Sequence, residues 1–304
     1  MILQVAYPLM ALSIIFSVIN ACLLHKFGNK DIKTTGDLFF FNGGISIVWT
    51  FILSIWFLAE GGKSITPTAL IFGVIYGIIL CAFLFFKMQS MAEGPVSLST
   101  LIGSCAFIIA TWFGVFYIPE NISFFQIAGQ ILLFVSLFLC VNPKKSGEKL
   151  TGKWFIYSFF FFLAGGAVGI IYKVFAKSDA AGEYNGMMLT ASVISAVLFF
   201  VTGLLVNIFS KKEVPKIRKS ALSYIILCGI VSCVYIRLNL SLSAVIPSAI
   251  FFPVSNGAMV ILSTLTGKLF FSEKLNKMQI TGILIGLIAI IITGCSDLLL
   301  KLFT

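Results

Sequence analysis

Long apolar runs separated by short polar connections occupy the chain from one end to the other. A helix needs roughly 20 predominantly apolar residues to cross the hydrocarbon core of a bilayer. The sequence contains ten segments of this kind, at residues 2–24, 38–59, 68–90, 95–117, 122–141, 154–177, 186–209, 221–241, 247–271 and 278–300. The pattern therefore predicts ten transmembrane segments.

These segments have the pattern of helices. A membrane-spanning strand would alternate apolar and polar residues over about 10 positions, whereas residues 155–162 are apolar on every face. Composition agrees, because 59% of the residues are hydrophobic, only 11% are charged, and the mean hydropathy is +1.08, outside the range of soluble domains. We expect an all-α integral membrane protein.

A short motif recurs at a fixed offset of 153 residues. Residues 120–129 and 273–282 share Glu, Gln, Ile and Gly at matching positions, and a further glycine precedes each segment at the same offset. The matched pairs are Gly114 with Gly267, Glu120 with Glu273, Gln126 with Gln279, Ile127 with Ile280, and Gly129 with Gly282. The repeat predicts two five-helix units, residues 1–150 and 151–304. Because five is odd, the second unit enters the membrane inverted relative to the first, as in many carriers.

A structural explanation of the repeated residues is favoured over a direct role in transport. A carboxylate just before a helix stabilises the N-terminal end of its dipole, and glycine lets a neighbouring helix approach closely. The same reasoning predicts helix-packing faces at the pairs Gly73 with Gly77, Gly165 with Gly169, and Gly282 with Gly286.

These residues make the chain resemble the drug/metabolite transporter superfamily, in particular its ten-span EamA-like branch. The resemblance covers the length, the five-plus-five repeat and the Glu-x5-Gln-x2-Gly signature that opens the fifth and tenth spans. It also includes the small, serine-rich start of the fourth span, at Gly94, Pro95, Ser97 and Ser99. The resemblance implies a cavity between the halves that opens alternately to either face. It would be lined by the third, fourth, eighth and ninth spans, with help from the first and sixth.

Two indications of orientation oppose each other. Of the 21 Lys and Arg residues, 16 lie on the side of the connections that follow odd-numbered spans. The positive-inside rule then places both termini outside the cytoplasm, whereas proteins similar to this one usually have both termini in the cytoplasm.

Acidic residues are absent from the middle of every predicted span. Small four-helix members of the superfamily that the chain resembles export cations with a buried glutamate in their first helix, and the matching region here, residues 11–20, contains none. The resemblance therefore implies that proton-coupled export of a hydrophobic cation is disfavoured. Three basic residues lie about one turn from a span end, namely Lys87, Lys173 and Arg237. Snorkelling to the headgroups is the favoured explanation. The alternative is contact with a carboxylate or phosphate of the substrate, for which Arg237 is the best candidate.

Uncharged polar residues within spans complete the predicted substrate-binding set. They are Asn20, Asn42, Tyr76, Ser104, Tyr172, Ser255 and Asn256. They could form a hydrogen-bonding ring around a polar solute or bond between helices, and both alternatives stay open. Pro253 lies deeper in its helix than a first-turn proline, so we expect it to loosen the ninth span and assist gating.

Neither a metal site nor a catalytic site is indicated. The seven cysteines are scattered singly through apolar segments, which is typical of packing residues, and the chain has one histidine, His25. We therefore expect no cofactor, no metal, no catalytic residue and no enzyme activity. The tryptophans Trp49, Trp56, Trp112 and Trp154 are predicted to anchor at the membrane interface.

The favoured function is a secondary transporter or facilitator that moves a small polar or amphiphilic metabolite, such as an amino acid, by alternating access. A flippase for lipid or lipid-linked sugar and a multidrug exporter are the alternatives. The expected partners are a small-molecule substrate and the lipid bilayer, without nucleic acid, and the chain could be a monomer or a homodimer. The expected location is the plasma membrane, or the inner membrane of a two-membrane bacterium.

Overall fold

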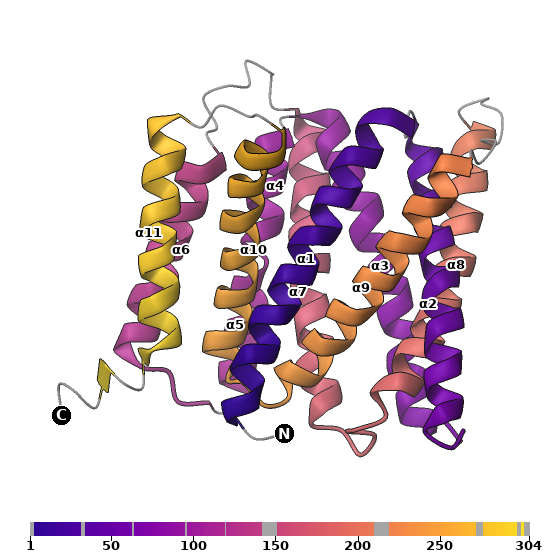
Figure 1. Ribbon diagram of the computed structural model, residues 1–304, viewed down its shortest axis with the longest axis horizontal. Helices are drawn as coiled ribbons and strands as arrows, with labels where there is room; N and C mark the ends of the chain where they lie inside the picture. The colour runs from indigo at the N-terminus through magenta and orange to yellow at the C-terminus, as the bar shows by residue number, and fades with distance from the viewer. Residues whose placement is uncertain are drawn as a thin grey trace. The chain divides into compact units, whose positions relative to one another are not determined.

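The computed structural model describes residues 3–31, 34–62, 64–94, 96–118, 120–141, 151–209, 219–271, 276–296 and 299–300. Within these ranges the chain forms eleven helices and no strand (Figure 1). They are α1 (Leu3–Asp31), α2 (Thr35–Ala59), α3 (Pro67–Glu93), α4 (Val96–Ser104), α5 (Phe107–Tyr117), α6 (Phe124–Val141), α7 (Gly152–Ala176), α8 (Tyr184–Phe209), α9 (Lys219–Ser243), α10 (Ser248–Phe271) and α11 (Lys277–Gly294). The predicted all-α class is confirmed.

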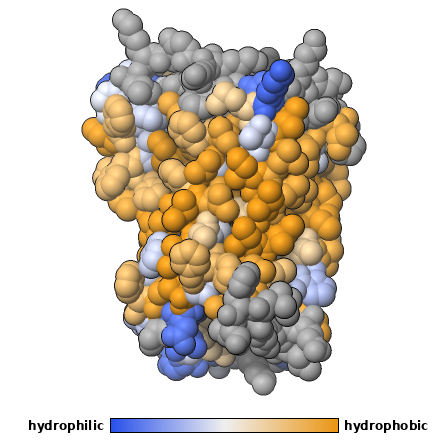
Figure 2. All heavy atoms as spheres, turned by 90° about the vertical axis from the view of Figure 1, so that its left-hand side faces the viewer, coloured by the Kyte–Doolittle hydropathy of each residue, from blue (hydrophilic) through white to orange (hydrophobic). Residues whose placement is uncertain are grey.

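Nine segments among the described residues are long and apolar enough to cross a membrane, and α6 is a shorter apolar helix. The face that carries α6 and α11 is broadly apolar, with hydrophilic residues toward its two ends (Figure 2). Its exposed large side chains include Ile131, Phe134, Val135, Phe138, Leu284, Leu287, Ile288 and Ile291. Such a surface belongs in lipid, and the chain is a multi-pass helical membrane protein.

Most helices begin and end within three residues of the predicted spans, but two ends differ more. Helix α1 continues to Asp31, so much of the predicted polar connection is helical. Helix α11 ends at Gly294, six residues before the predicted end at 300. Hydropathy marks only the apolar part of a segment, whereas backbone hydrogen bonds decide where the helix ends.

The fourth predicted span is two helices, so the expectation of one continuous helix over 95–117 is wrong at its centre. Helix α4 ends at Ser104 and α5 begins at Phe107. Between them, the N–H of Ala106 donates to the carbonyl of Gly103 at 3.2 Å, an i to i−3 bond in place of the α-helical pattern. A Cβ at Gly103 would lie 2.3 Å from the ring of Phe161. Helix α7 therefore approaches α4 closely at the tightened last turn of α4.

The described chain divides into two compact units. Unit 1 comprises Met1–Tyr7, Ala82–Lys173 and Leu242–Thr304, and unit 2 comprises Pro8–Cys81 and Val174–Ser241. Each unit combines segments from both halves of the sequence. The division into repeats at 1–150 and 151–304 concerns ancestry along the chain and stays a prediction.

In unit 1, α6 and α11 pack side by side in antiparallel directions (Figure 1). A Cβ at Gly129 would lie 2.1 Å from Thr293 Oγ1, and a Cβ at Gly282 would lie 2.9 Å from the backbone nitrogen of Cys140. The contacts are reciprocal, because Gly282 follows Gly129 by 153 residues and Thr293 follows Cys140 by the same number. The prediction that these glycines serve close helix packing is confirmed.

Both helices also begin with the same capping arrangement. The backbone N–H of Gln126 donates to Ser123 Oγ at 3.2 Å, and the N–H of Ser123 donates to Gln126 Oε1 at 3.0 Å. Asn276 and Gln279 form the equivalent pair at the start of α11. The repeated glutamine is thus the third helical residue of a capping box, which pairs two backbone N–H groups that the helix leaves free.

Unit 2 contains a second antiparallel pair of this kind, α2 with α8. The rings of Phe40 and Phe200 are 5.8 Å apart, Gly43 lies against Phe200, and Gly203 lies against Phe40. Here the matching residues are 160 apart. This pair was not predicted, because phenylalanine and glycine are too common in the chain for two short matches to stand out.

The remaining glycine pairs also serve packing. Carbon atoms added at Gly73 and Gly77 would meet the backbone oxygens of Met187 and Ala191 at 2.6 and 2.9 Å. Those at Gly165 and Gly169 would meet the side chains of Ala106 and Ala110 on α5 at 2.8 and 2.3 Å. The predicted small-residue faces are therefore confirmed.

Two of the four tryptophans were wrongly predicted as interface anchors. Trp49 and Trp154 are buried, with 7% and 4% of their surface exposed. The indole N–H of Trp49 donates to Ser232 Oγ at 2.8 Å, and that of Trp154 donates to Ser99 Oγ at 3.0 Å. A hydroxyl within the unit replaces the headgroup region as the partner of each indole.

Candidate functional site

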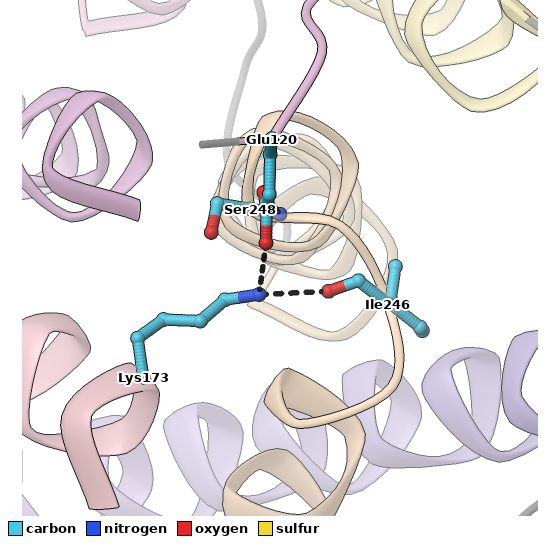
Figure 3. A network of polar contacts seen from close by, with 4 residues as sticks. All are labelled: Glu120, Lys173, Ile246 and Ser248. Carbon is cyan, nitrogen blue, oxygen red and sulfur yellow. Dashed lines mark hydrogen bonds and ion pairs between the residues drawn. The ribbon is translucent and has the colours of Figure 1, made fainter. Parts of the chain in front are cut away.

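An ion pair between a buried lysine and a partly buried glutamate lies in unit 1 (Figure 3). Lys173, on α7, is only 3% exposed. Its Nζ donates to Glu120 Oε1 at 3.1 Å and to the backbone carbonyl of Ile246 at 3.0 Å. A buried ammonium group is tolerated only when paired and hydrogen-bonded, and both conditions hold here. The expectation that Lys173 snorkels to the headgroups is therefore wrong.

The second oxygen of Glu120 holds the start of α10. Glu120 Oε2 accepts a hydrogen bond of 2.5 Å from the backbone nitrogen of Ser248, the first residue of that helix. The sequence suggested that this carboxylate serves the N-terminus of the helix directly following it. Instead Ser123 caps α6, and Glu120 joins the segment before α6 to α7 and α10 (Figure 3).

One polar atom without a described partner, Ser248 Oγ, lies near this pair, and others occur elsewhere in unit 1. A Cβ at Gly114 of α5 would clash with Ser248 Oγ and would lie 3.9 Å from Lys173 Cγ, so all three residues are close together. The hydroxyls of Thr111 and Ser248 are buried and have no hydrogen-bond partner among the described residues, as is true of Gln130 Nε2 and Ser255 Oγ. Buried unpaired polar groups are costly and therefore often mark functional positions.

Arg237 has a different environment, in unit 2. From α9 its Nε donates to Asn185 Oδ1 at 2.7 Å, and Asn185 is 3% exposed. The guanidinium carbon lies 4.8 Å from the ring centre of Tyr184 and 5.6 Å from that of Trp56. Two aromatic rings and one amide thus position the guanidinium group.

The predicted substrate-binding and gating residues are divided between the units. Unit 1 contains Ser104, Tyr172, Pro253, Ser255 and Asn256, and unit 2 contains Asn20, Asn42, Tyr76 and Arg237. Eight of the nine lie inside the helix predicted for them, and Ser104 is the last residue of α4, where the predicted fourth span is interrupted. Their joint role as one binding ring stays a prediction.

Three of these side chains bond to their own helix, an alternative that the sequence interpretation did not consider. Ser104 Oγ donates to the carbonyl of Thr100 at 2.8 Å, and Asn42 and Asn256 donate to carbonyls four residues earlier at 2.8 and 2.9 Å. By contrast, Asn20 Oδ1 and Ser255 Oγ are buried without a partner in the described chain.

The two tyrosines and the proline are buried. Tyr76 and Tyr172 are 1% and 6% exposed. Pro253 lies inside α10, which stays helical from Ser248 to Phe271. Its proposed part in gating stays a prediction. Pro95 and Glu273, which belong to the sequence signatures, lie outside the described residues.

Several residues of these sites were not identified from the sequence. Asn185, Tyr184 and Trp56 around Arg237 come from two other helices, and no spacing along the chain connects them to it. A signal did exist for the ion pair, since Glu120 is a rare repeated acid and Lys173 is a rare base inside an apolar span.

The fold and the buried charges define a multi-pass α-helical membrane protein with polar centres inside its spans. Comparison with known proteins adds the following. No family model matches the chain. An uncharacterized protein of Haemophilus influenzae is 27% identical over 184 residues, which cover 56% of this chain and 57% of that protein. The match thus spans little more than half of the length of that relative. A crystal structure of a protein of unstated activity aligns with a TM-score of 0.71 at 14% identity, over 95% of this chain and 98% of the other. That likeness concerns the fold alone.

Proposed function

We propose that this protein is a secondary transporter or facilitator that carries a small polar or amphiphilic solute by alternating access. The observation that carries the proposal is the reciprocal antiparallel packing of α6 with α11 and of α2 with α8. In each pair the matching residues occupy mirrored positions, at offsets of 153 and 160. Duplicated units inserted in opposite senses would give this packing, and inverted repeats are the architecture of many carriers.

The interior of unit 1 supports the same proposal. Carriers often bind solutes where a transmembrane helix is interrupted, and the interruption between α4 and α5 lies in the fourth span. Buried hydroxyl and amide groups without described partners lie on α5, α6 and α10. A polar solute would supply the missing hydrogen bonds. The resemblance to the drug/metabolite transporter superfamily, carried by the repeated signature, agrees with this proposal.

Reconstitution into liposomes tests the proposal. Uptake of radiolabelled amino acids, polyamines, sugars, nucleotides and quaternary amines would be compared with protein-free liposomes, after a thermal-shift screen has selected solutes that stabilise the protein. We expect saturable uptake of at least one selected solute and competition by its unlabelled form. Non-saturable flux would instead indicate a channel.

The alternative functions give different outcomes in the same vesicles. Scrambling of fluorescent phospholipid, followed by dithionite quenching, would support a flippase if it occurred without solute uptake. Uptake restricted to hydrophobic cations of unrelated structure would support a multidrug exporter. Either result would overturn the proposed metabolite carrier.

A further inference from the structure

Lys173, which is buried, and Arg237, which is partly buried, have their charges balanced in different ways. Lys173 is neutralised by a carboxylate at 3.1 Å. Arg237 has no carboxylate within ion-pair distance in the described part of the chain, and its polar partner is the neutral amide of Asn185. A cation inside a membrane-spanning segment is costly unless an anion or a water-filled space compensates it. Arg237 therefore has the surroundings of a cation that receives its anion from elsewhere.

The geometry of the guanidinium group defines which anion fits. Nε–H is occupied by Asn185 Oδ1 at 2.7 Å. The two terminal nitrogens make no hydrogen bond or ion pair with any described residue, so the end of the fork is available. That end presents two parallel N–H donors, which match the two oxygens of a carboxylate or phosphate.

The neighbouring side chains hold this fork in place. Tyr184 and Trp56 lie at 4.8 and 5.6 Å from the guanidinium carbon. Asn185 is itself buried, so its amide cannot easily move away. Because the arginine is positioned before any ligand arrives, less side-chain entropy is lost on binding. Trp56 is 41% exposed and Arg237 is only partly buried, so the site is not sealed inside the unit.

Among the described residues, the acidic residue Glu60 is near enough to act on Arg237. Glu60, exposed at the end of α2, interacts with it electrostatically but is not within ion-pair distance. An exposed carboxylate at that range is screened by solvent and is free to move aside. Glu60 therefore does not take the place of an anion bound at ion-pair distance.

We propose that Arg237 is an oxyanion-recognition residue that binds the carboxylate or phosphate of the transported solute end-on, through its two terminal nitrogens. The inference rests on the proposed function in one respect, that the oxyanion belongs to a solute. The solute class is thereby narrowed to organic anions and zwitterions. Amines and neutral sugars without an acidic group would lack this contact.

Binding to purified protein in a neutral detergent tests the proposal without requiring transport. The probes are benzoate and phenyl phosphate, each compared with uncharged benzamide at constant ionic strength, with the midpoint of thermal unfolding as the readout. We expect both anions, but not benzamide, to raise the midpoint in a concentration-dependent manner. Arg237→Gln should remove the effect, and Arg237→Lys should weaken apparent binding roughly tenfold, because one ammonium cannot replace the planar fork.

Two further variants separate recognition from folding. Asn185→Asp keeps Arg237 but gives it a resident carboxylate, so we expect a folded protein that no longer responds to benzoate. Lys177→Gln removes an exposed positive charge from the connection before α8 and should leave the response unchanged. An unchanged benzoate response in Arg237→Gln, or no response to any anion in the unmodified protein, would overturn the proposal.

A lipid phosphate has the same chemistry as a solute phosphate, so a separate comparison is needed. The unfolding midpoint would be measured in nanodiscs of phosphatidylcholine with and without phosphatidylglycerol. An Arg237-dependent effect of phosphatidylglycerol, without one of benzoate, would contradict the assignment to a solute. The two proposals can fail independently: uptake with unchanged KM in Arg237→Gln sinks only this inference, and Arg237-dependent binding without uptake sinks only the transport function.

Discussion

At the scale of single residues, the ion pair of Glu120 with Lys173 departs most from the expectation that charged side chains reach the headgroups. The two carboxylate oxygens of Glu120 serve different partners, one the ammonium group of Lys173 and the other the first backbone N–H of α10. Lys173 also donates to the carbonyl of Ile246, just before that helix. The pair thus connects the entry of α10 to α7, and removal of the carboxylate leaves the charge of Lys173 buried.

We predict that Glu120→Gln destabilises the protein by about 3–5 kcal/mol, because it removes the carboxylate that neutralises the buried ammonium group of Lys173. Thermal unfolding in detergent would measure the loss. Glu120→Gln combined with Lys173→Met should recover part of it, since the double variant buries no unpaired charge. Glu93→Gln is a control for removal of a carboxylate near a helix end. A double variant no more stable than Glu120→Gln alone would contradict the ion-pair explanation.

Sequence reasoning identified these residues better than it identified their roles. Glu120, Lys173 and Arg237 were all singled out, because charges are rare in so apolar a chain. Their partners could not be identified, since Ile246 and Asn185 are separated in sequence from Lys173 and Arg237 by 73 and 52 positions. Such pairings depend on which helices pack together, and hydropathy does not encode that.

At the scale of helices, glycine sets how closely α6 and α11 approach. The backbone nitrogen of Cys140 would lie 2.9 Å from a Cβ at Gly282, and a backbone atom cannot rotate away as a side chain does. Gly294 ends the same helix and has no atom within 4 Å of its added Cβ. The two positions form a matched pair on one helix.

We predict that Gly282→Ala lowers the free energy of unfolding by about 1–3 kcal/mol, because the helices must move apart to accept the methyl group. Gly294→Ala should be neutral or slightly stabilising, since alanine favours the helix and meets no neighbour there. Thermal unfolding of both variants provides the measurement. Equal midpoints for the two would show that the close approach does not limit stability.

The extent of each helix was predictable where apolar runs have sharp ends, and the interruption of the fourth span was not. The start of α7 at Gly152 lies two residues from its predicted position. The turn at Cys105 and Ala106 directly follows Gly103 and Ser104, but glycine and serine also occur inside uninterrupted helices of this chain, such as α3 and α7, so their presence does not predict the turn. The structure shows the ring of Phe161 packed against Gly103 next to this turn, and the two residues are far apart in the sequence.

At the scale of the whole molecule, the repeat could be detected from the sequence at one place only. Glu120 and Gln126 made the 153-residue offset visible, because those residue types are rare here. The 160-residue correspondence of α2 with α8 rests on Phe40, Gly43 and their counterparts, which are common types. The reciprocal contacts within each helix pair support both sequence matches. The direction in which each helix crosses the membrane can then be tested by experiment.

The last prediction concerns the membrane sides reached by two short connections. Because α6 and α11 are antiparallel, their first residues must lie at opposite faces of the membrane. Asn121 and Lys277 are exposed at these two starts. In a cysteine-free background, Asn121→Cys and Lys277→Cys should react with a membrane-impermeant maleimide from opposite sides. Labelling of both from one side would rule out inverted insertion.

The side of Asn121 also decides between the two indications of orientation, since four spans place it on the side of the N-terminus. Cytoplasmic labelling there supports the arrangement usual among similar transporters, and external labelling supports the distribution of lysine and arginine.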